Sequence, residues 1–162
     1  MKISYTPIGV IHSPFTELNG MPIQPTSESS VSGYLEIYPE FAEGLKDLEG
    51  FSHIYLIYHL HKAYQAKLTV TPFLDTVPRG VFATRAPRRP NSIGLSLVRL
   101  ERIEGNHVYI EQIDVLDGTP LLDLKPYIPA FENGENIRTG WLEKNSQKVH
   151  KAKSDQRFIN ES

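Results

Sequence analysis

Residues 96–115 of the chain read SLVRLERIEGNHVYIEQIDV. Two runs rich in β-branched, aliphatic and aromatic residues, 96–104 and 107–115, lie on either side of Gly105-Asn106. Two small turn-forming residues between apolar runs favour a tight hairpin. The stretch therefore predicts two neighbouring antiparallel strands.

Similar short runs occur along most of the chain. The predicted strands are 8–12, 33–38, 53–61, 67–73, 81–84, 96–104 and 107–115. One short helix is predicted over 39–48, because Pro39 suits a helix start and Leu45 and Leu48 offer apolar contacts. About seven strands with short links predict a mainly β fold, a small antiparallel β-barrel or sandwich with one or two short helices.

The size and composition fit a single globular domain. The chain has 162 residues, is 40% hydrophobic and 22% charged, and contains no cysteine. The lack of cysteine excludes disulfides, thiolate metal sites and a cysteine nucleophile, and is compatible with a reducing compartment. The first residues resemble no signal peptide, and no apolar run approaches a membrane span. We expect a cytoplasmic protein with a barrel domain over 1–142 and a polar tail over 143–162.

Residues 76–100 are unusually basic for a chain whose net charge is −2. The stretch contains no Asp or Glu and carries five arginines: Arg79, Arg85, Arg88, Arg89 and Arg99. Pro87 and Pro90 bracket the Arg-Arg pair and disfavour a helix there. Guanidinium groups fit the oxygens of phosphates and carboxylates. The stretch predicts an anion-binding loop, the alternative being a solvated surface with no partner.

Few common catalytic motifs are present. The chain lacks GxGxxG after a strand, GxxxxGK[ST], GxSxG and HExxH. His59 and His61 share one face of the predicted strand 53–61 and could chelate a metal. His53 lies roughly 26 Å from His61 along such a strand, too far for a third ligand. His107 or Glu111 could serve instead, although no complete ligand set can be read from the sequence.

Four segments together resemble one known family. They are IGVIHSPF (8–15), LEGFSHIYLIYHLH (48–61), GVFATRAPRRPNSIGLSLVRL (80–100) and DVLDGTPLLDLKPYIP (114–129). They are similar to the TsaA-like, or TrmO, family of β-barrel tRNA methyltransferases that depend on S-adenosylmethionine. Those enzymes methylate N6 of N6-threonylcarbamoyladenosine beside the anticodon. The resemblance covers roughly residues 5–142.

The resemblance implies a barrel that forms a homodimer, with the cofactor near the subunit interface. The residues that match cofactor-binding positions of the family are Gln24, Pro25, His61, Lys62, Arg85, Leu95, Leu116, Asp117, Gly118 and Thr119. The chain departs from the family at Ile23 (usually Arg), Ala86 (often Ser) and Ser92 (often Pro). It also resembles a short form of the family, without the C-terminal domain that longer members carry.

The implied chemistry needs few special residues. Methyl transfer from a sulfonium depends on positioning and exclusion of water, without a metal or a covalent nucleophile. An acceptor for the N6 proton would help, because the nitrogen lone pair is delocalised. Asp114, Asp123 and Tyr127 are the catalytic candidates, and Asp117 is expected to face the cofactor. The plainer interpretation of Asp117-Gly118 is a surface turn capped by Asp117.

The implied partner is the anticodon loop of tRNA, whose bases are already unpaired. Arg88, Arg89 and Lys125 are predicted to bind RNA, and Lys125 with Tyr127 could contact the modified base; the alternative is that both pack against the barrel. Two other functions stay open. One is an S-adenosylmethionine-binding adaptor, or a methyltransferase for another small acceptor. The other is a metal-dependent cupin-like barrel built on His59 and His61.

Overall fold

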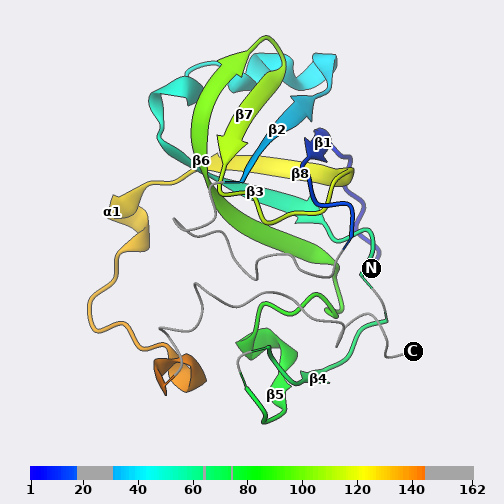
Figure 1. Ribbon diagram of the computed structural model, residues 1–162, viewed down its shortest axis with the longest axis vertical. Coiled ribbons are helices and arrows are strands. Elements are labelled where there is room, and N and C mark those ends of the chain that lie inside the picture. Colours follow the sequence, from blue (N-terminus) through cyan, green and yellow to red (C-terminus); the bar gives the residue numbers. More distant parts are fainter. Residues whose placement is uncertain (18–30, 64, 74, 145–162) are drawn as a thin grey trace.

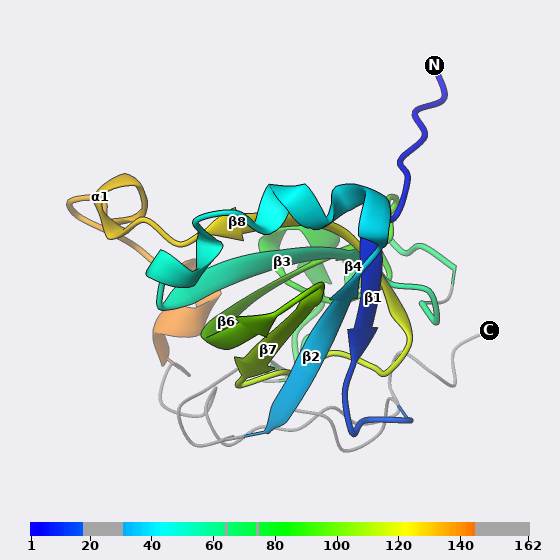
Figure 2. The same ribbon diagram turned by 90° about the horizontal axis from the view of Figure 1, so that it is seen from above.

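Six antiparallel strands close into a barrel in the order β1-β2-β7-β6-β3-β8 (Figure 1). The computed structural model describes residues 1–17, 31–63, 65–73 and 75–144. The barrel strands are β1 (Gly9–His12), β2 (Ser32–Ile37), β3 (His53–His59), β6 (Ile93–Glu104), β7 (His107–Glu111) and β8 (Thr119–Pro126). Seen from above, they surround a common interior, and the N-terminal residues project away from it (Figure 2). The predicted mainly β barrel fold is confirmed.

The hairpin predicted from residues 96–115 is formed by β6 and β7. Glu104 pairs with His107, so that the connection has two residues, and Gly105 adopts a φ of 60° that suits such a turn. The register shifts between Leu100 and Arg102, where one strand carries an extra residue. β6 also pairs with β3, so this hairpin supplies two adjacent walls of the barrel.

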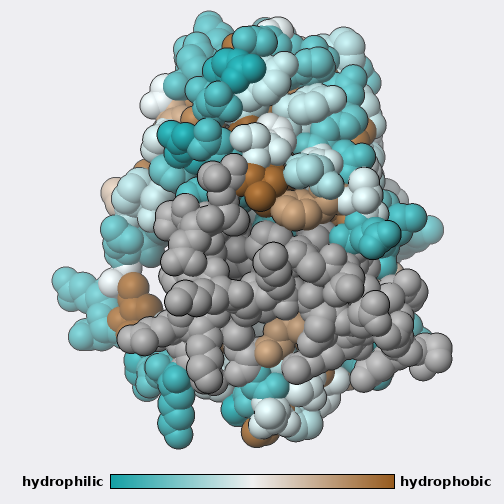
Figure 3. Space-filling view, in the orientation of Figure 1, coloured by the Kyte–Doolittle hydropathy of each residue, from teal (hydrophilic) through white to brown (hydrophobic). Residues whose placement is uncertain are grey.

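The core is made by alternate residues of all six strands. It includes Ile11, Leu35, Ile54, Leu56, Val98, Val108, Ile110 and Leu121, each fully buried. The outward residues of the same strands are partly exposed. Over the barrel, the face seen in Figure 3 is mostly hydrophilic, and its most prominent apolar patch lies near the middle of the view.

β8 was not predicted from the sequence. It pairs with β3 on one side and with β1 on the other, and thereby closes the barrel. Its alternation is interrupted by a register shift opposite Ile57 and Tyr58. The predicted helix 39–48 is two 3₁₀ helices, η1 (Pro39–Leu45) and η2 (Leu48–Gly50), separated at Asp47, whose φ is 69°.

A small lobe lies beside the barrel between β3 and β6 in sequence (Figure 1). It contains β4 (Thr69–Val70), β5 (Arg79–Gly80) and η3 (Val81–Ala83) around a cluster of Val70, Val81 and Ala86. The predicted strand 67–73 is therefore only two residues long. The predicted strand 81–84 is wrong, because Thr84 turns its amide and hydroxyl back to the Val81 carbonyl at 3.1 and 2.8 Å.

The chain after β8 forms α1 (Pro129–Glu132) and η4 (Gly140–Lys144). The indole Nε1 of Trp141 donates a hydrogen bond to the Ala83 carbonyl at 2.9 Å, which attaches η4 to the lobe. The Arg79 guanidinium lies 5.6 Å from the Trp141 ring centre. Most of the predicted polar tail lies outside the described residues. No helix in the described part of the chain is long and apolar enough to cross a bilayer.

One glycine of β6 makes room for a large side chain inside the barrel. Gly94 pairs with Tyr58 of β3, and any Cβ at position 94 would overlap the Tyr58 ring. The ring fills this space and its hydroxyl contacts Ser96 at 2.8 Å. Gly94, Ser96 and Tyr58 are therefore one packing unit.

Gly94→Ala should destabilise the barrel by about 1–3 kcal/mol, because the Tyr58 ring must move. Denaturant unfolding would measure this loss. Gly44→Ala is the control, since a Cβ there meets nothing within 4 Å. Equal stabilities of the two variants would contradict the packing described here.

Candidate active site

Several of the candidate residues lie where β3 and β1 end and where β6 and β8 begin. We call this the site end of the barrel. His59 of β3 pairs with Ile93 of β6, Tyr58 pairs with Leu121 of β8, and Ile11 of β1 pairs with Thr119. His61, Leu95 and the turn 116–119 therefore share one end of the barrel, although they are far apart in sequence.

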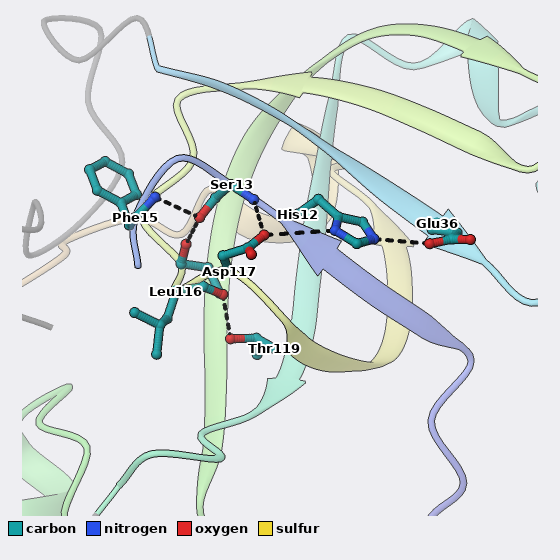
Figure 4. A network of polar contacts seen from close by, with 8 residues as sticks. His12, Ser13, Phe15, Glu36, Leu116, Asp117 and Thr119 are labelled. Carbon is teal, nitrogen blue, oxygen red and sulfur yellow. Dashed lines mark hydrogen bonds and ion pairs between the residues drawn. The ribbon is translucent and has the colours of Figure 1, made fainter. Parts of the chain in front are cut away.

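The turn 116–119 is fastened to the end of β1 (Figure 4). The Asp117 amide donates to the Phe15 carbonyl at 2.7 Å, and the Gly118 amide donates to the Ile11 carbonyl at 2.9 Å. The Thr119 hydroxyl closes the turn by donating to the Leu116 carbonyl at 2.6 Å. Gly118 has a φ of 80°, which disfavours a side chain, and open space surrounds its Cα. Asp117 and Gly118 at the tip of the turn are thus exposed, whereas Leu116 and Thr119 are buried.

The Asp117 carboxylate faces β1. Its Oδ1 accepts a hydrogen bond from the Ser13 amide at 3.0 Å and lies 3.7 Å from Nδ1 of His12. The other nitrogen of His12, Nε2, is 2.9 Å from Oε2 of Glu36, and its ring stacks on Tyr34 (Figure 4). Asp117 therefore helps to hold the turn, as the plainer interpretation of this Asp-Gly pair expects. The contacts of His12, Ser13 and Glu36 were not predicted from sequence.

A chain of three polar side chains lies inside the site end. The Tyr58 hydroxyl is 2.8 Å from the Ser96 hydroxyl, and the Ser96 hydroxyl donates to Oδ1 of Asp114 at 2.6 Å. All three residues are buried. Tyr58 and Ser96 were missed, although Ser96 shares the inward parity of Gly94 and Val98 and is polar in an apolar run.

Burial raises the pKa of Asp114 to about 7, while the Ser96 hydrogen bond, a backbone hydrogen bond and the positive charge of Arg85 oppose the rise. Burial also raises the pKa of Tyr58, and the Asp114 charge adds to this effect. Arg85 is exposed, yet its charge acts on both groups. The charge of Arg85 thus acts on the buried Asp114 and Tyr58 and also on Tyr55 on the outer face of β3.

His61 and Lys62 follow β3 in a turn. The amide of Leu60 donates to the Ser92 carbonyl at 2.8 Å, which ties this turn to the start of β6. Burial lowers the pKa of His61, and the charges of Lys62 and His59 lower it further. The imidazole is thus favoured in its neutral form at neutral pH.

Leu95 lies on the outer face of β6, opposite Ile57 of β3. Its side chain is 42% exposed, as is that of Ile93. The predicted Leu95 therefore lies outside the barrel wall, whereas the neighbouring Ser96, which was not predicted, lies inside it.

The Arg-Arg pair does not form the exposed anion-binding surface that the sequence predicted. Arg88 is 1% exposed, so its predicted role on RNA phosphates is wrong for a side chain buried in the lobe. Nη1 of Arg89 donates to the carbonyls of Val81, Thr84 and Ala86 at 2.8–3.2 Å. Arg89 thus holds together the loop that carries Arg85.

Three other candidates lie along β8 and beyond it. Asp123 forms an exposed ion pair with Lys125 at 2.9 Å. The Tyr127 amide donates to the carbonyl of His53, at the opposite end of β3 from His59, about 20 Å away for six residues of strand. Tyr127 packs against the Tyr55 ring instead. The structure therefore does not bring Tyr127 together with the site end.

The alternative metal site gains no ligands from the fold. No group of three His, Cys, Asp or Glu side chains suited to a metal occurs among the described residues. His107 packs on Tyr34, and Glu111 pairs with Arg99, which itself lies opposite His53. Gln24 and Pro25, the first predicted cofactor residues, lie outside the described residues.

Comparison with known proteins decides the family. The model of the tRNA-methyltransferase O N-terminal domain matches residues 10–133, which include the barrel and the lobe. The chain belongs to this family.

Relatives of this tRNA-methyltransferase O family differ in length. A probable S-adenosyl-L-methionine-binding protein of Pyrococcus abyssi is 55% identical over 98% of this chain and 86% of its own. The tRNA (adenine(37)-N6)-methyltransferase of Mus musculus is 40% identical over 81% of this chain but only 32% of its own length. A crystal structure of TrmO from Pseudomonas aeruginosa, 42% identical, superposes with a TM-score of 0.74 over 86% of this chain and 62% of that one.

The buried carboxyl of Asp114 should give the protein a characteristic dependence of stability on pH. The folded state keeps this proton up to about pH 7, whereas the unfolded chain loses it near the ordinary aspartate pKa of 3.8. The folded state then binds more protons in this window, so stability falls as pH rises through it. Asp114→Asn should remove that fall, measured by denaturant unfolding between pH 4 and pH 7.

Asp47→Asn, at an exposed turn, is the matched control and should keep the wild-type pH dependence. If the Asp114→Asn and Asp47→Asn proteins lose stability alike as the pH rises, Asp114 ionises normally in the folded protein.

Proposed function

We propose that the protein transfers the methyl group of S-adenosylmethionine to N6 of N6-threonylcarbamoyladenosine beside the anticodon of tRNA. The observation that carries this proposal is that the His61-Lys62 turn and the turn 116–119 share the site end of the barrel, where the charge of Arg85 acts on Asp114. The mouse and human relatives named tRNA (adenine(37)-N6)-methyltransferase, 40% and 38% identical, support the reaction type. Because the substrate is tRNA, we place the reaction in the cytoplasm.

The residues at the site end fit this cofactor. Arg85 suits the carboxylate of the methionine part, since a guanidinium pairs with carboxylate oxygens. The backbone of 116–119, with open space at Gly118, suits the polar edges of the adenosine. Leu95, which is 42% exposed, supplies apolar surface, and His61, with its lowered pKa, adds no full positive charge beside a sulfonium. S-adenosylmethionine supplies the methyl group as an electrophilic carbon, which the protein has only to align.

Because Arg88 is buried, it is removed from the predicted RNA contacts. Of the three cations predicted to bind RNA, Lys125 has an exposed ammonium group, with 62% of its side chain accessible. We keep Lys125 as a proposed phosphate contact. The proposed role of Arg89 in RNA binding is indirect, because its guanidinium holds together the loop that carries Arg85. An anticodon-loop base is unpaired and reaches a pocket at little cost.

A second candidate function is cofactor binding without methyl transfer. This chain aligns with 86% of the length of a probable S-adenosyl-L-methionine-binding protein from Pyrococcus abyssi. It aligns with 90% of the length of an S-adenosyl-L-methionine-binding protein from Archaeoglobus fulgidus. These proteins have nearly the size of this chain, whereas the mammalian methyltransferases are about three times longer.

The methyl-transfer experiment uses two tRNA substrates, one carrying N6-threonylcarbamoyladenosine and one carrying plain adenosine at the same position. Wild-type protein should add one methyl group to the first substrate only, detected by mass spectrometry of the nucleosides. Arg85→Ala should lose cofactor binding in calorimetry by about tenfold or more, because a charge-assisted contact is removed. Arg102→Ala, whose guanidinium pairs with Glu101 and Glu104, is the control.

Methylation of plain adenosine would reject the threonylcarbamoyl specificity but keep the reaction type. Binding of the cofactor with neither tRNA methylated would favour the binding-protein alternative. Equal cofactor affinity of the Arg85→Ala and Arg102→Ala proteins would remove Arg85 from the site.

We also propose that the protein is a homodimer, as the family resemblance implies. Ile93 and Leu95 expose apolar surface on the outer face of β6 next to the cofactor residues, and a second copy would cover it. Light scattering should give twice the 18.4 kDa of one chain, and Ile93→Glu should shift the mass towards one chain. Ile137→Glu is the control, because Ile137 is also an exposed isoleucine, 69% accessible, but lies after α1 rather than on β6. A wild-type mass of one chain would reject the dimer.

A further inference from the structure

We propose that Asp114 is the general base of the methyl transfer and accepts the N6 proton, and that Ser96 positions its carboxylate. This inference depends on the proposed function. Asp114 lies two residues before the turn 116–119, so its carboxylate is at the same end of the barrel as the proposed cofactor contacts. It is 8% exposed, so that a small part of the residue stays accessible.

Asp114 differs from every other carboxylate in the described part of the chain, because it alone is buried. Asp117 is held by the Ser13 amide and by His12, and Glu36 by His12. Asp123 forms an exposed ion pair with Lys125. Asp114 is therefore the one carboxylate among the described residues that is shielded from bulk solvent.

The hydroxyl chain gives the Asp114 carboxylate a fixed direction. Ser96 donates its proton to Oδ1 of Asp114, so the Ser96 oxygen has to accept the contact from Tyr58. The Tyr58 hydroxyl then donates to Ser96, and the Ser96 hydroxyl donates to Asp114. This arrangement leaves the Asp114 carboxylate as the acceptor at the end of the chain. Gly94 provides the space that lets Tyr58 take part in this chain.

The groups around Asp114 adjust its basicity. Tyr58 on β3 and Arg85 after η3 are the titratable or charged groups that act on it, together with the Ser96 hydroxyl on β6. Burial raises the pKa of Asp114 to about 7, and Ser96 and Arg85 keep it from rising further. A base whose pKa lies near the working pH combines an ionised form with a useful proton affinity.

The step balances in atoms and charge. N6 uses its lone pair to form a bond to the methyl carbon, and the carbon–sulfur bond breaks with its electron pair left on sulfur. The N6 proton moves to a carboxylate oxygen of Asp114. The products are the methylated base, a neutral thioether and a protonated Asp114, which then releases its proton to solvent.

The decisive test compares Asp114→Asn with Asp47→Asn in single-turnover methyl transfer at saturating S-adenosylmethionine and modified tRNA. Asparagine keeps an oxygen that accepts from Ser96 but cannot take a proton. We expect a rate at least about 100-fold lower for Asp114→Asn, with cofactor affinity unchanged in calorimetry. Asp47→Asn, at an exposed turn, should match the wild type.

A positioning role for Ser96 predicts a change in pH dependence. Because the Ser96 hydrogen bond lowers the pKa of Asp114, Ser96→Ala should move the acid limb of the rate profile to higher pH. Titration of the ¹³C-labelled carboxyl carbon of Asp114 by NMR should show the same shift without any turnover. Ser52→Ala, an exposed serine that contacts His53, is the control and should move neither.

Retention of the wild-type rate by a folded, cofactor-binding Asp114→Asn protein would overturn the assignment while leaving the proposed function intact. If Asp114→Asn does not fold, an unchanged acid limb and carboxyl titration in Ser96→Ala would overturn it instead. Failure of the wild-type protein to bind S-adenosylmethionine would reject the proposed function itself, and the role of Asp114 with it.

Discussion

The double pairing of β8 holds the rest of the structure in place. β8 lies between β3 and β1, and without it the barrel would be an open sheet with two unpaired edges. Its first residue, Thr119, pairs with Ile11 and also ends the turn 116–119. Closure of the barrel and placement of the turn therefore depend on the same few backbone hydrogen bonds. The position of the candidate site follows from the topology rather than from the local sequence.

Local patterns predicted much of the barrel. The hairpin around Gly105-Asn106 and the alternation in β3 depend on neighbouring residues, so the sequence alone was sufficient. β8 was not predicted because its alternating pattern is interrupted by Pro120, Asp123, Lys125 and Pro126. Its register also shifts beside Tyr58. Its strand conformation is imposed by β1 and β3 on either side. No local signal contains that information.

The site was predicted only in part, and for similar reasons. The resemblance predicted Arg85, His61 and the turn 116–119 as cofactor contacts, and the fold brings His61 and the turn to one end of the barrel. Burial of Arg88 was unpredictable, since charged pairs bracketed by prolines are usually solvated. The inward parity of Ser96 in the run IGLSLV was a usable signal that was overlooked. Buried polar groups reduce stability unless they are hydrogen-bonded, and Ser96 and Asp114 are bonded to each other.

The lobe is in contact with an intrinsic fluorophore. Trp141 is the one tryptophan of the chain, and its indole is bonded to Ala83, two residues before Arg85. Indole emission depends on hydrogen bonding and on nearby charge, and Arg79 lies over the same ring. The intrinsic fluorescence of the unlabelled protein therefore reports on the loop that carries Arg85. Any rearrangement of that loop can be followed in real time without attaching a dye.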